Sequence, residues 1–139
     1  MRFSSRLSIG IHSLFIINNM RDVKVTSEMI AEYTGNNPVN IRKILGSLKR
    51  AGFIEISKGK KADTVLIKSL DDITLWDVFC AVEGIDEINI LNNICNPLNP
   101  YPEGEPVRHA FRGEIEKVIL AGKNKMQLCT VGMLMNNMK

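Results

Sequence analysis

The sequence predicts a mainly α-helical fold with one small β-hairpin, and three observations lead to this prediction. Apolar residues recur at helical spacing in several stretches that are bounded by Ser, Thr, Pro or Gly. Two short runs rich in β-branched residues, 53–57 and 64–68, lie on either side of a polar loop that contains glycine. The 139 residues, of which 45% are hydrophobic and 24% charged, suffice for one compact domain with its own core.

The first two helices are predicted from apolar spacing and from their end signals. Residues 4–18 carry apolar side chains on one helical face, namely Leu7, Ile11, Leu14 and Phe15, and two asparagines follow. A second, short helix is expected over residues 28–35. Thr26 or Ser27 offers its N-cap, and Gly35 closes it.

A third helix is predicted to start at Pro38, whose fixed φ angle suits a first helical turn, and to end at Gly52. Its apolar residues fall at positions i, i+3, i+4 and i+7, the pattern of one buried stripe: Ile41, Ile44, Leu45 and Leu48. The polar residues of the segment are then left toward solvent: Asn37, Asn40, Arg42, Lys43, Ser47 and Lys49. Tyr33 and Phe53, on either side of this helix, are expected to pack in the core rather than to stack on bases.

Helix, short helix, glycine turn, helix and hairpin, in this order, are typical of a winged helix-turn-helix domain. Such a domain presents the exposed face of its second core-packed helix to the major groove of DNA. Residues 36–61 contain seven Lys or Arg side chains and one carboxylate, and three of these lysines lie in the hairpin loop. Double-stranded DNA suits this pattern, because cations bind phosphates and amides read base edges.

The charge is unevenly distributed along the chain, although the formal net charge is only +3. Residues 1–61 hold eleven Lys or Arg and four Asp or Glu, whereas residues 62–139 hold seven and eleven. A basic first half predicts a polyanionic partner, from which the acidic half should stay away. We therefore assign residues 1–70 to a DNA-binding region and residues 71–139 to a dimerisation and candidate sensor region, within one compact domain.

The second half begins with a helix that Thr74 caps, with Asp77 three residues later, and that Gly84 closes. Residues 92–106 are crowded with Asn, Pro and Gly and predict a loop. A long helix then starts at Pro106, with apolar residues around most of its girth. Such a helix at the end of a small domain is expected to pack against a second copy of the chain, so a twofold dimer is predicted.

Composition favours a cytoplasmic binding protein over a membrane protein or an enzyme. The N-terminal segment carries Arg6 and His12 among its apolar residues, unlike a signal peptide, and no apolar stretch is long enough to span a bilayer. Cys80, Cys95 and Cys129 follow no metal-like spacing and are expected to be reduced thiols. With two histidines and no glycine-rich phosphate loop, the chain offers no recognisable catalytic set.

The chain resembles the Rrf-two type of winged helix-turn-helix transcriptional regulators, the family of the iron–sulfur cluster regulator, the nitric-oxide-sensitive repressor and the cysteine-metabolism repressor. The resemblance rests on MRFSSRLSIG, IAEYTGNNPVNIRKILGSLKRAGFIE, ITLWDVFCAVEG and the Cys-Asn-Pro loop before the terminal helix. The stretch ITLWDV-x-x-AVEG after the wing is the most specific of these. The resemblance covers essentially the whole chain and implies a homodimeric regulator of a pseudo-palindromic operator, which we expect to be a repressor.

The resemblance also implies roles for individual residues. The residues expected at the DNA are Ser4, Arg6, Thr26, Ser27, Asn36, Asn37, Pro38, Val39, Asn40, Arg42, Lys43, Lys49, Lys58, Lys60 and Lys61. Among these, Asn37 to Lys43 would approach the major groove, the residues before Asn36 would lie near phosphates, and the last three would form the wing. The residues expected at the dimer interface are Trp76, Val107, Phe111, Ile115, Val118 and Ile119.

The sequence departs from the family pattern in two places. Wings of the family commonly carry several glycines and an aromatic residue, whereas here Gly59 is followed by Lys-Lys-Ala-Asp. Cluster-binding relatives place three cysteines in and near the loop that here holds Cys95 alone. Because an iron–sulfur cluster is held by several thiolates, we expect no cluster and no other cofactor. Cys95, in an exposed loop, is a candidate redox sensor.

One alternative function stays open at this point. A basic winged helix also suits RNA binding, or contact with another protein through the edge of its hairpin. Footprinting on duplex DNA separates these alternatives from the leading prediction. The operator, the regulated genes and the effector are not indicated by the sequence.

Overall fold

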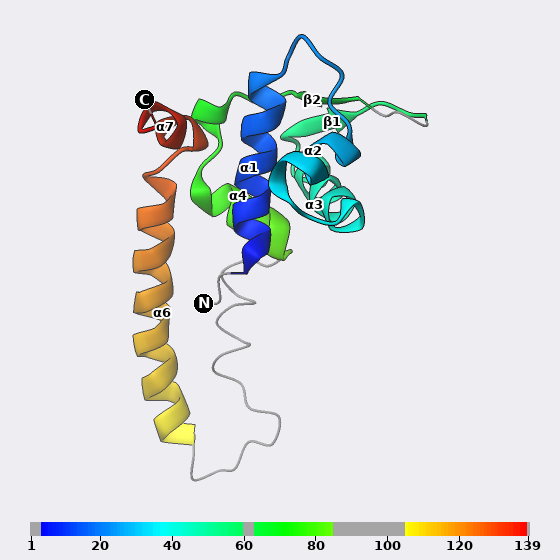
Figure 1. Cartoon of the computed structure of the whole chain (residues 1–139). Helices are drawn as coiled ribbons and strands as arrows, with labels where there is room; N and C mark the ends of the chain where they lie inside the picture. The colour runs from blue at the N-terminus through cyan, green and yellow to red at the C-terminus, as the bar shows by residue number, and fades with distance from the viewer. Residues whose placement is uncertain (1–3, 60–62, 85–104, 139) are drawn as a thin grey trace.

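The computed structural model of the chain describes residues 4–59, 63–84 and 105–138. These residues form a helical body with a two-stranded hairpin at one edge and a long helix along one flank (Figure 1). The predicted fold class, a winged helix with a long C-terminal helix, is confirmed. The elements are α1 Ser5–Asn19, α2 Ser27–Thr34, α3 Pro38–Arg50, β1 Ile54–Ile56, β2 Thr64–Leu66, a short 3-10 helix η1 Leu70–Asp72, α4 Leu75–Glu83, α6 Glu105–Gln127 and α7 Val131–Asn136.

Side-chain caps fix the ends of α2 and the start of α3. The Thr26 hydroxyl accepts a hydrogen bond from the backbone N–H of Met29 at 3.3 Å, so Thr26 is the N-cap of α2. Gly35 ends α2 with a φ of 68°, in the left-handed region that favours glycine. The Asn37 side chain accepts from the backbone N–H of Val39 at 2.8 Å, which starts α3 directly after the glycine turn.

The apolar stripe of α3 is buried in the main hydrophobic cluster, as its spacing predicts. Its members are Ile41, Ile44, Leu45 and Leu48, none of them more than 4% exposed. They pack with residues of α1, α2 and β1, among them Leu14, Ile30 and Ile54. Phe53 is buried as expected, but the same expectation for Tyr33 was wrong, since that side chain is 64% exposed. The short helix α2 buries only Ile30 and Ala31.

The hairpin is antiparallel, with Glu55 opposite Val65 at its centre. Its strands are shorter than the predicted runs 53–57 and 64–68, although backbone hydrogen bonds continue the pairing by one step at each end. The hairpin is tied to the body because the backbone N–H of Thr64 donates to the carbonyl oxygen of Val25 at 2.9 Å. The Asp63 carboxylate accepts in turn from the backbone N–H of Val25 at 2.8 Å.

The start of α4 is held by the predicted capping box. The hydroxyl of Thr74 accepts from the backbone N–H of Asp77 at 3.1 Å, and the Asp77 carboxylate accepts from the backbone N–H of Thr74 at 3.0 Å. Gly84 ends the helix with a φ of 65°. This helix lies against α1 and α3, so it belongs to the same body as the elements of the winged helix.

A second hydrophobic cluster joins α4 to α6. It consists of Trp76, Phe79, Ile119 and Met126, and the ring centroids of Trp76 and Phe79 lie 5.5 Å apart. Only the C-terminal part of α6 takes part, and the N-terminal part extends away from the folded body (Figure 1). Among the described residues, no helix is both long and apolar enough to cross a membrane, α6 included.

The C-terminal end of α6 is fixed to the body by a connection that the sequence does not predict. Thr130 pairs with Thr74 in an isolated antiparallel bridge. Beside it, the backbone N–H of Leu75 donates to the carbonyl oxygen of Cys129 at 2.9 Å, and that of Val131 donates to Ile73 at 2.8 Å. The helix α7 follows at once, and its first residue, Val131, is fully buried in the main cluster.

Candidate nucleic-acid interface

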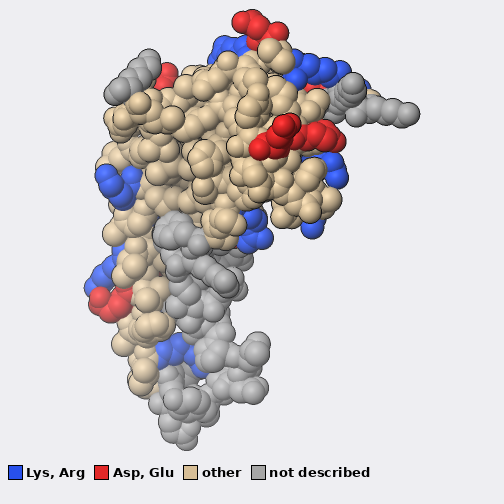
Figure 2. Space-filling view, viewed as in Figure 1, with Lys and Arg blue, Asp and Glu red and all other residues tan. Residues whose placement is uncertain are grey.

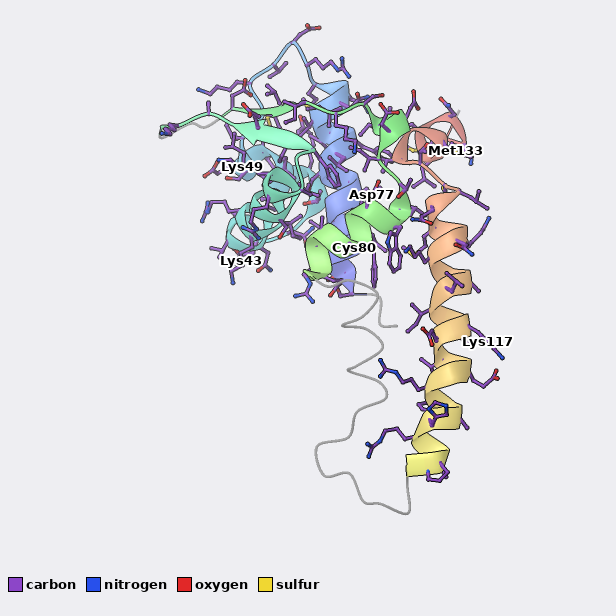
Figure 3. All side chains as sticks on the ribbon, turned by 180° about the vertical axis from the view of Figure 1, so that it is seen from behind. Lys43, Lys49, Asp77, Cys80, Lys117 and Met133 are labelled. Atoms are coloured by element: carbon purple, nitrogen blue, oxygen red, sulfur yellow. The ribbon has the colours of Figure 1, made fainter. Side chains whose placement is uncertain are left out.

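The solvent face of α3 presents the residues that the sequence assigns to the major groove. The exposed ones are Asn37, Val39, Asn40, Arg42, Lys43 and Lys49, whereas Asn36 and Pro38 are half-buried at the start of the helix. Lys43 and Lys49 lie at α3 on the side of the molecule opposite α6 (Figure 3). Because the stripe on the other side is locked in the core, this face is held rigidly outward.

The first turn of α3 is arranged to receive an anion or a polar base edge. Its N-terminal N–H groups carry the positive end of the helix dipole. The side-chain oxygen of Asn37 accepts the capping hydrogen bond, which leaves the N–H groups of its side-chain amide on the exposed side. Asn40, three residues later, is also exposed. Amide side chains in this position are suited to base edges, and adenine is the usual partner of Asn.

Lys and Arg side chains lie at the edge of α3 and also along α6, while acidic side chains are found over α2 (Figure 2). One contact joins the two signs: Arg42 Nη1 lies 3.6 Å from Glu28 Oε1. Both side chains are more than half exposed. An exposed pair of this kind contributes little to stability and is readily exchanged for a phosphate.

A hollow of about 400 Å³ adjoins α3 on the side that faces α1 and α4. Four cationic side chains line it, together with apolar and small residues: Arg6, Arg42, Lys43, Ile44, Gly46, Ser47, Arg50 and Val82. Arg50 was missed by the sequence analysis. Its guanidinium donates to the Ser47 hydroxyl at 3.2 Å. The signal in the sequence is the spacing of Arg42, Gly46 and Arg50, which lie on one face of the helix with the smallest residue between two cations.

Ser4 and Arg6 stand at the start of α1 and are both bound to Glu83. Arg6 Nη2 donates to Glu83 Oε2 at 2.7 Å, and the Ser4 hydroxyl donates to Glu83 Oε1. The Arg6 side chain nevertheless stays 56% exposed and lines the cationic hollow. The structure thus brings Arg6 next to the cations of α3, from which it is far away in the sequence.

Thr26 and Ser27 are half-buried at the N-terminus of α2. The hydroxyl of Thr26 is engaged in capping, and that of Ser27 donates to Glu28 Oε2 at 3.3 Å. Their placement at a helix start suits a backbone phosphate, which binds N-terminal N–H groups. The carboxylate of Glu28 accepts the hydrogen bond of the Ser27 hydroxyl, so a phosphate at this helix start would have to approach on the side of Ser27 that faces away from Glu28.

The structure describes only part of the wing, the loop between β1 and β2. Lys58, two residues after the end of β1, is exposed, and Gly59 follows with a φ of 124°, which favours glycine. Lys60, Lys61 and the candidate redox sensor Cys95 lie outside the described residues.

The two described cysteines lie on α4 and after the end of α6. Cys80 is half-buried and packs against the second hydrophobic cluster, and Cys129 is half-buried at the end of α6. The thiol of Cys129 donates to the Thr130 carbonyl oxygen at 3.7 Å. Within residues 4–59, 63–84 and 105–138, no group of three or more His, Cys, Asp or Glu side chains is placed to hold a metal ion.

The residues expected at a dimer interface divide into two groups. Trp76 and Ile119 are buried within the chain itself, in the second hydrophobic cluster. Val107, Phe111 and Val118 are 69%, 46% and 61% exposed on α6. Ile115, between them, is half-buried. The outward apolar residues of α6 are therefore exposed, and the inward ones hold α6 to α4.

The chain is similar to known transcriptional regulators over nearly its whole length. The family model Rrf2, described as an iron-dependent transcriptional regulator, matches residues 3–137. YwnA of Bacillus subtilis (strain 168), by its name a candidate HTH-type transcriptional regulator, is 30% identical over 135 residues, which cover 97% of this chain and 98% of YwnA.

Solved structures show the same fold. A crystal structure of a candidate transcriptional regulator from Lactobacillus plantarum matches with a TM-score of 0.80 at 20% identity, over 96% of this chain and 89% of that one. CymR (YrzC), the global cysteine regulator of B. subtilis, matches with a TM-score of 0.67 at 18% identity, over 96% and 95%. At these identities the likeness concerns the fold alone.

Proposed function

The chain belongs to the Rrf2 family of transcriptional regulators, and we propose that it acts as a homodimeric repressor of a pseudo-palindromic operator, without a bound iron–sulfur cluster. The observation that carries the proposal is the two-sided build of α3. Its apolar stripe is buried, and its other side presents amides and cations to solvent. A helix fixed in this way can enter a major groove as a rigid body, with Asn37 and Asn40 nearest the bases.

Phosphate contacts are assigned to the cations and hydroxyls around α3. Arg6, Lys43 and Arg50 line the hollow beside α3, and Lys49 and Lys58 are exposed nearby in the chain. Such contacts fix the register of the protein on the duplex, whereas the amides of α3 read its sequence. No catalytic step is involved, because a regulator of this kind acts by occupying its site.

The dimer is supported by the part of α6 that extends away from the body. Its exposed apolar side chains lie where the described residues offer no cover, and such patches mark contacts with a partner. A second copy can cover them by a twofold arrangement in which each α6 packs against the other. Two copies of α3 would then meet two half-sites of one operator.

An iron–sulfur cluster does not fit the residues of this chain, although the family description names iron. A cluster is held by several thiolates, sometimes together with histidine, and the segment in which cluster-binding relatives place three cysteines holds only Cys95 here, with His109 further along the sequence. Cys80 packs against the second hydrophobic cluster, and Cys129 belongs to the connection between α6 and α7. The redox-sensor role of Cys95 stays a prediction, and neither the sequence nor the fold indicates the effector.

Repression is the simpler mode for a small dimer, since occupation of the operator is enough to exclude a polymerase. The protein would accordingly act in the cytoplasm, where the chromosome is accessible. Footprinting on duplex DNA tests the proposal: we expect protection of two half-sites whose centres lie about one helical turn, or a multiple of it, apart. Tighter binding to structured RNA than to any duplex would replace this proposal by the RNA-binding alternative.

A further inference from the structure

Glu83 connects the start of α1 to the end of α4. One of its carboxylate oxygens accepts a hydrogen bond from the Ser4 hydroxyl, and the other accepts from Arg6 Nη2. The Glu83 side chain is only 10% exposed, whereas that of Arg6 is 56% exposed. The carboxylate therefore sits behind the arginine, and the arginine faces the cationic hollow beside α3.

We propose that Glu83 is a positioning residue for DNA binding, which holds Arg6 in the geometry that receives one backbone phosphate together with Lys43, Ser47 and Arg50. The inference rests on the proposed function, because it assumes that the phosphate belongs to duplex DNA. It gives a role to the carboxylate that lies behind Arg6 at the edge of the hollow.

The hydrogen bonds around Ser4 show how Glu83 orders this region. The Ser4 hydroxyl accepts from the backbone N–H of Arg6 at 3.2 Å, which makes Ser4 the N-cap of α1. The same hydroxyl donates its own hydrogen to Glu83. A hydroxyl has one donor and two acceptor positions, so both bonds are compatible. Glu83 thus orients the cap and the arginine two residues later at the same time.

Arginine is suited to this arrangement. Its guanidinium carries five N–H donors in a rigid planar fork, so it can bind a carboxylate on one side and a phosphate on the other. A long side chain loses rotamer freedom when it binds, and a side chain that is already held in one geometry loses less. The gain from Glu83 is therefore preorganisation of Arg6.

The charge of Glu83 acts in the opposite direction. A carboxylate next to the hollow lowers its positive potential and, by this effect alone, weakens the attraction of a phosphate. Removal of the charge would then tighten binding to every DNA sequence. A positioning role and a simple charge effect consequently predict changes of opposite sign, which makes the two distinguishable.

The test is Glu83→Gln, which keeps the shape of the side chain and removes its charge. We expect the variant to bind an operator duplex about threefold to tenfold more weakly than the wild type. The slope of log affinity against log salt concentration should become shallower by about one. In an Arg6→Ala background the same substitution should no longer weaken binding, because the arginine that it positions is gone.

Glu28→Gln is the matched control. Glu28 also pairs with an arginine of this face, Arg42, but its side chain is 67% exposed. The control removes the same charge without a buried carboxylate, and we expect it to bind the duplex no more weakly than the wild type. If Glu83→Gln binds as tightly as the wild type, or more tightly as a charge effect alone requires, the positioning role is overturned.

Arg6→Lys serves as the second variant if Glu83→Gln lowers the melting temperature so far that binding cannot be measured. Lysine keeps the charge but lacks the fork, so we expect weaker binding with an unchanged salt dependence. Wild-type affinity for Arg6→Lys would overturn the proposal in the same way. Failure of the proposed function looks different: the wild type itself would then fail to bind duplex DNA.

Discussion

Gly132, at the start of α7, lies against Asp71 of η1 so closely that a Cβ atom on the glycine would be 2.0 Å from the Asp71 oxygen Oδ1 and 3.1 Å from its backbone nitrogen. The contact is adjacent in sequence to the backbone hydrogen bond between Val131 and Ile73, so it belongs to the connection that holds the C-terminal end of α6 to the body. A side chain at position 132 would push this connection apart.

Gly132→Ala is therefore expected to destabilise the protein, although alanine favours helices more than glycine does. Overpacking typically costs about 1–3 kcal/mol, and part of this is offset by the helix propensity of alanine, about 1 kcal/mol. Gly113→Ala is the matched control, since nothing lies within 4 Å of a Cβ at that position of α6. Unfolding by denaturant at equal protein concentrations should show a loss for the first variant and a small gain for the second. Equal stability of the two variants would contradict the close contact.

The proposed division of residues into those that contact bases and those that contact phosphates makes a second prediction. Asn40→Ala should weaken binding to the operator by about 1–3 kcal/mol and leave binding to unrelated duplexes unchanged, because it removes a base contact. Lys58→Ala should weaken binding to all duplexes alike. It should also make the slope of log affinity against log salt concentration shallower by about one. Competition assays with operator and unrelated duplexes measure both effects. Identical behaviour of the two variants would remove the distinction.

The proposed dimer makes a third prediction. Val118→Asp places a charge among the exposed apolar residues of α6 and should convert the dimer to a folded monomer, because an unpaired charge is costly to bury. Val65→Asp is the control, since Val65 is 47% exposed on β2, outside α6. Sedimentation equilibrium gives the mass of each variant, and circular dichroism reports its helix content. If Val118→Asp stays dimeric, the interface lies elsewhere.

The cysteine content makes a fourth prediction. Protein purified without oxygen should show no visible absorption, and it should bind its operator after treatment with an iron chelator as tightly as before, because Cys95 is the one cysteine in the segment where cluster-binding relatives place three. A visible absorption band that is lost together with DNA binding on chelation would show that a cluster is present after all.

Local signals predicted most of the winged helix, because each depends on a few neighbouring residues. The stripe of α3, the glycine turn at Gly35 and the capping box of Thr74 and Asp77 are all patterns of this kind. Tyr33 was placed wrongly because a helix of eight residues can bury only one narrow face.

Contacts between distant segments were not predictable from such signals. Glu83 meets Ser4 and Arg6 across 79 and 77 residues, and the bridge between Thr74 and Thr130 joins two segments of ordinary composition. The two buried interface candidates, Trp76 and Ile119, illustrate the same limit. Apolar periodicity shows that a helix face is covered, but it does not distinguish a neighbour in the same chain from a second copy.

The central claim is that α3 and the cations around it bind double-stranded DNA, and the salt dependence of duplex binding tests it most directly. With about six to ten phosphate contacts per dimer, affinity for a selected operator should fall by about 10³–10⁵-fold between about 50 and 200 mM salt. An affinity that stays level over this range, or no measurable binding to any duplex at the lower salt concentration, would contradict the claim.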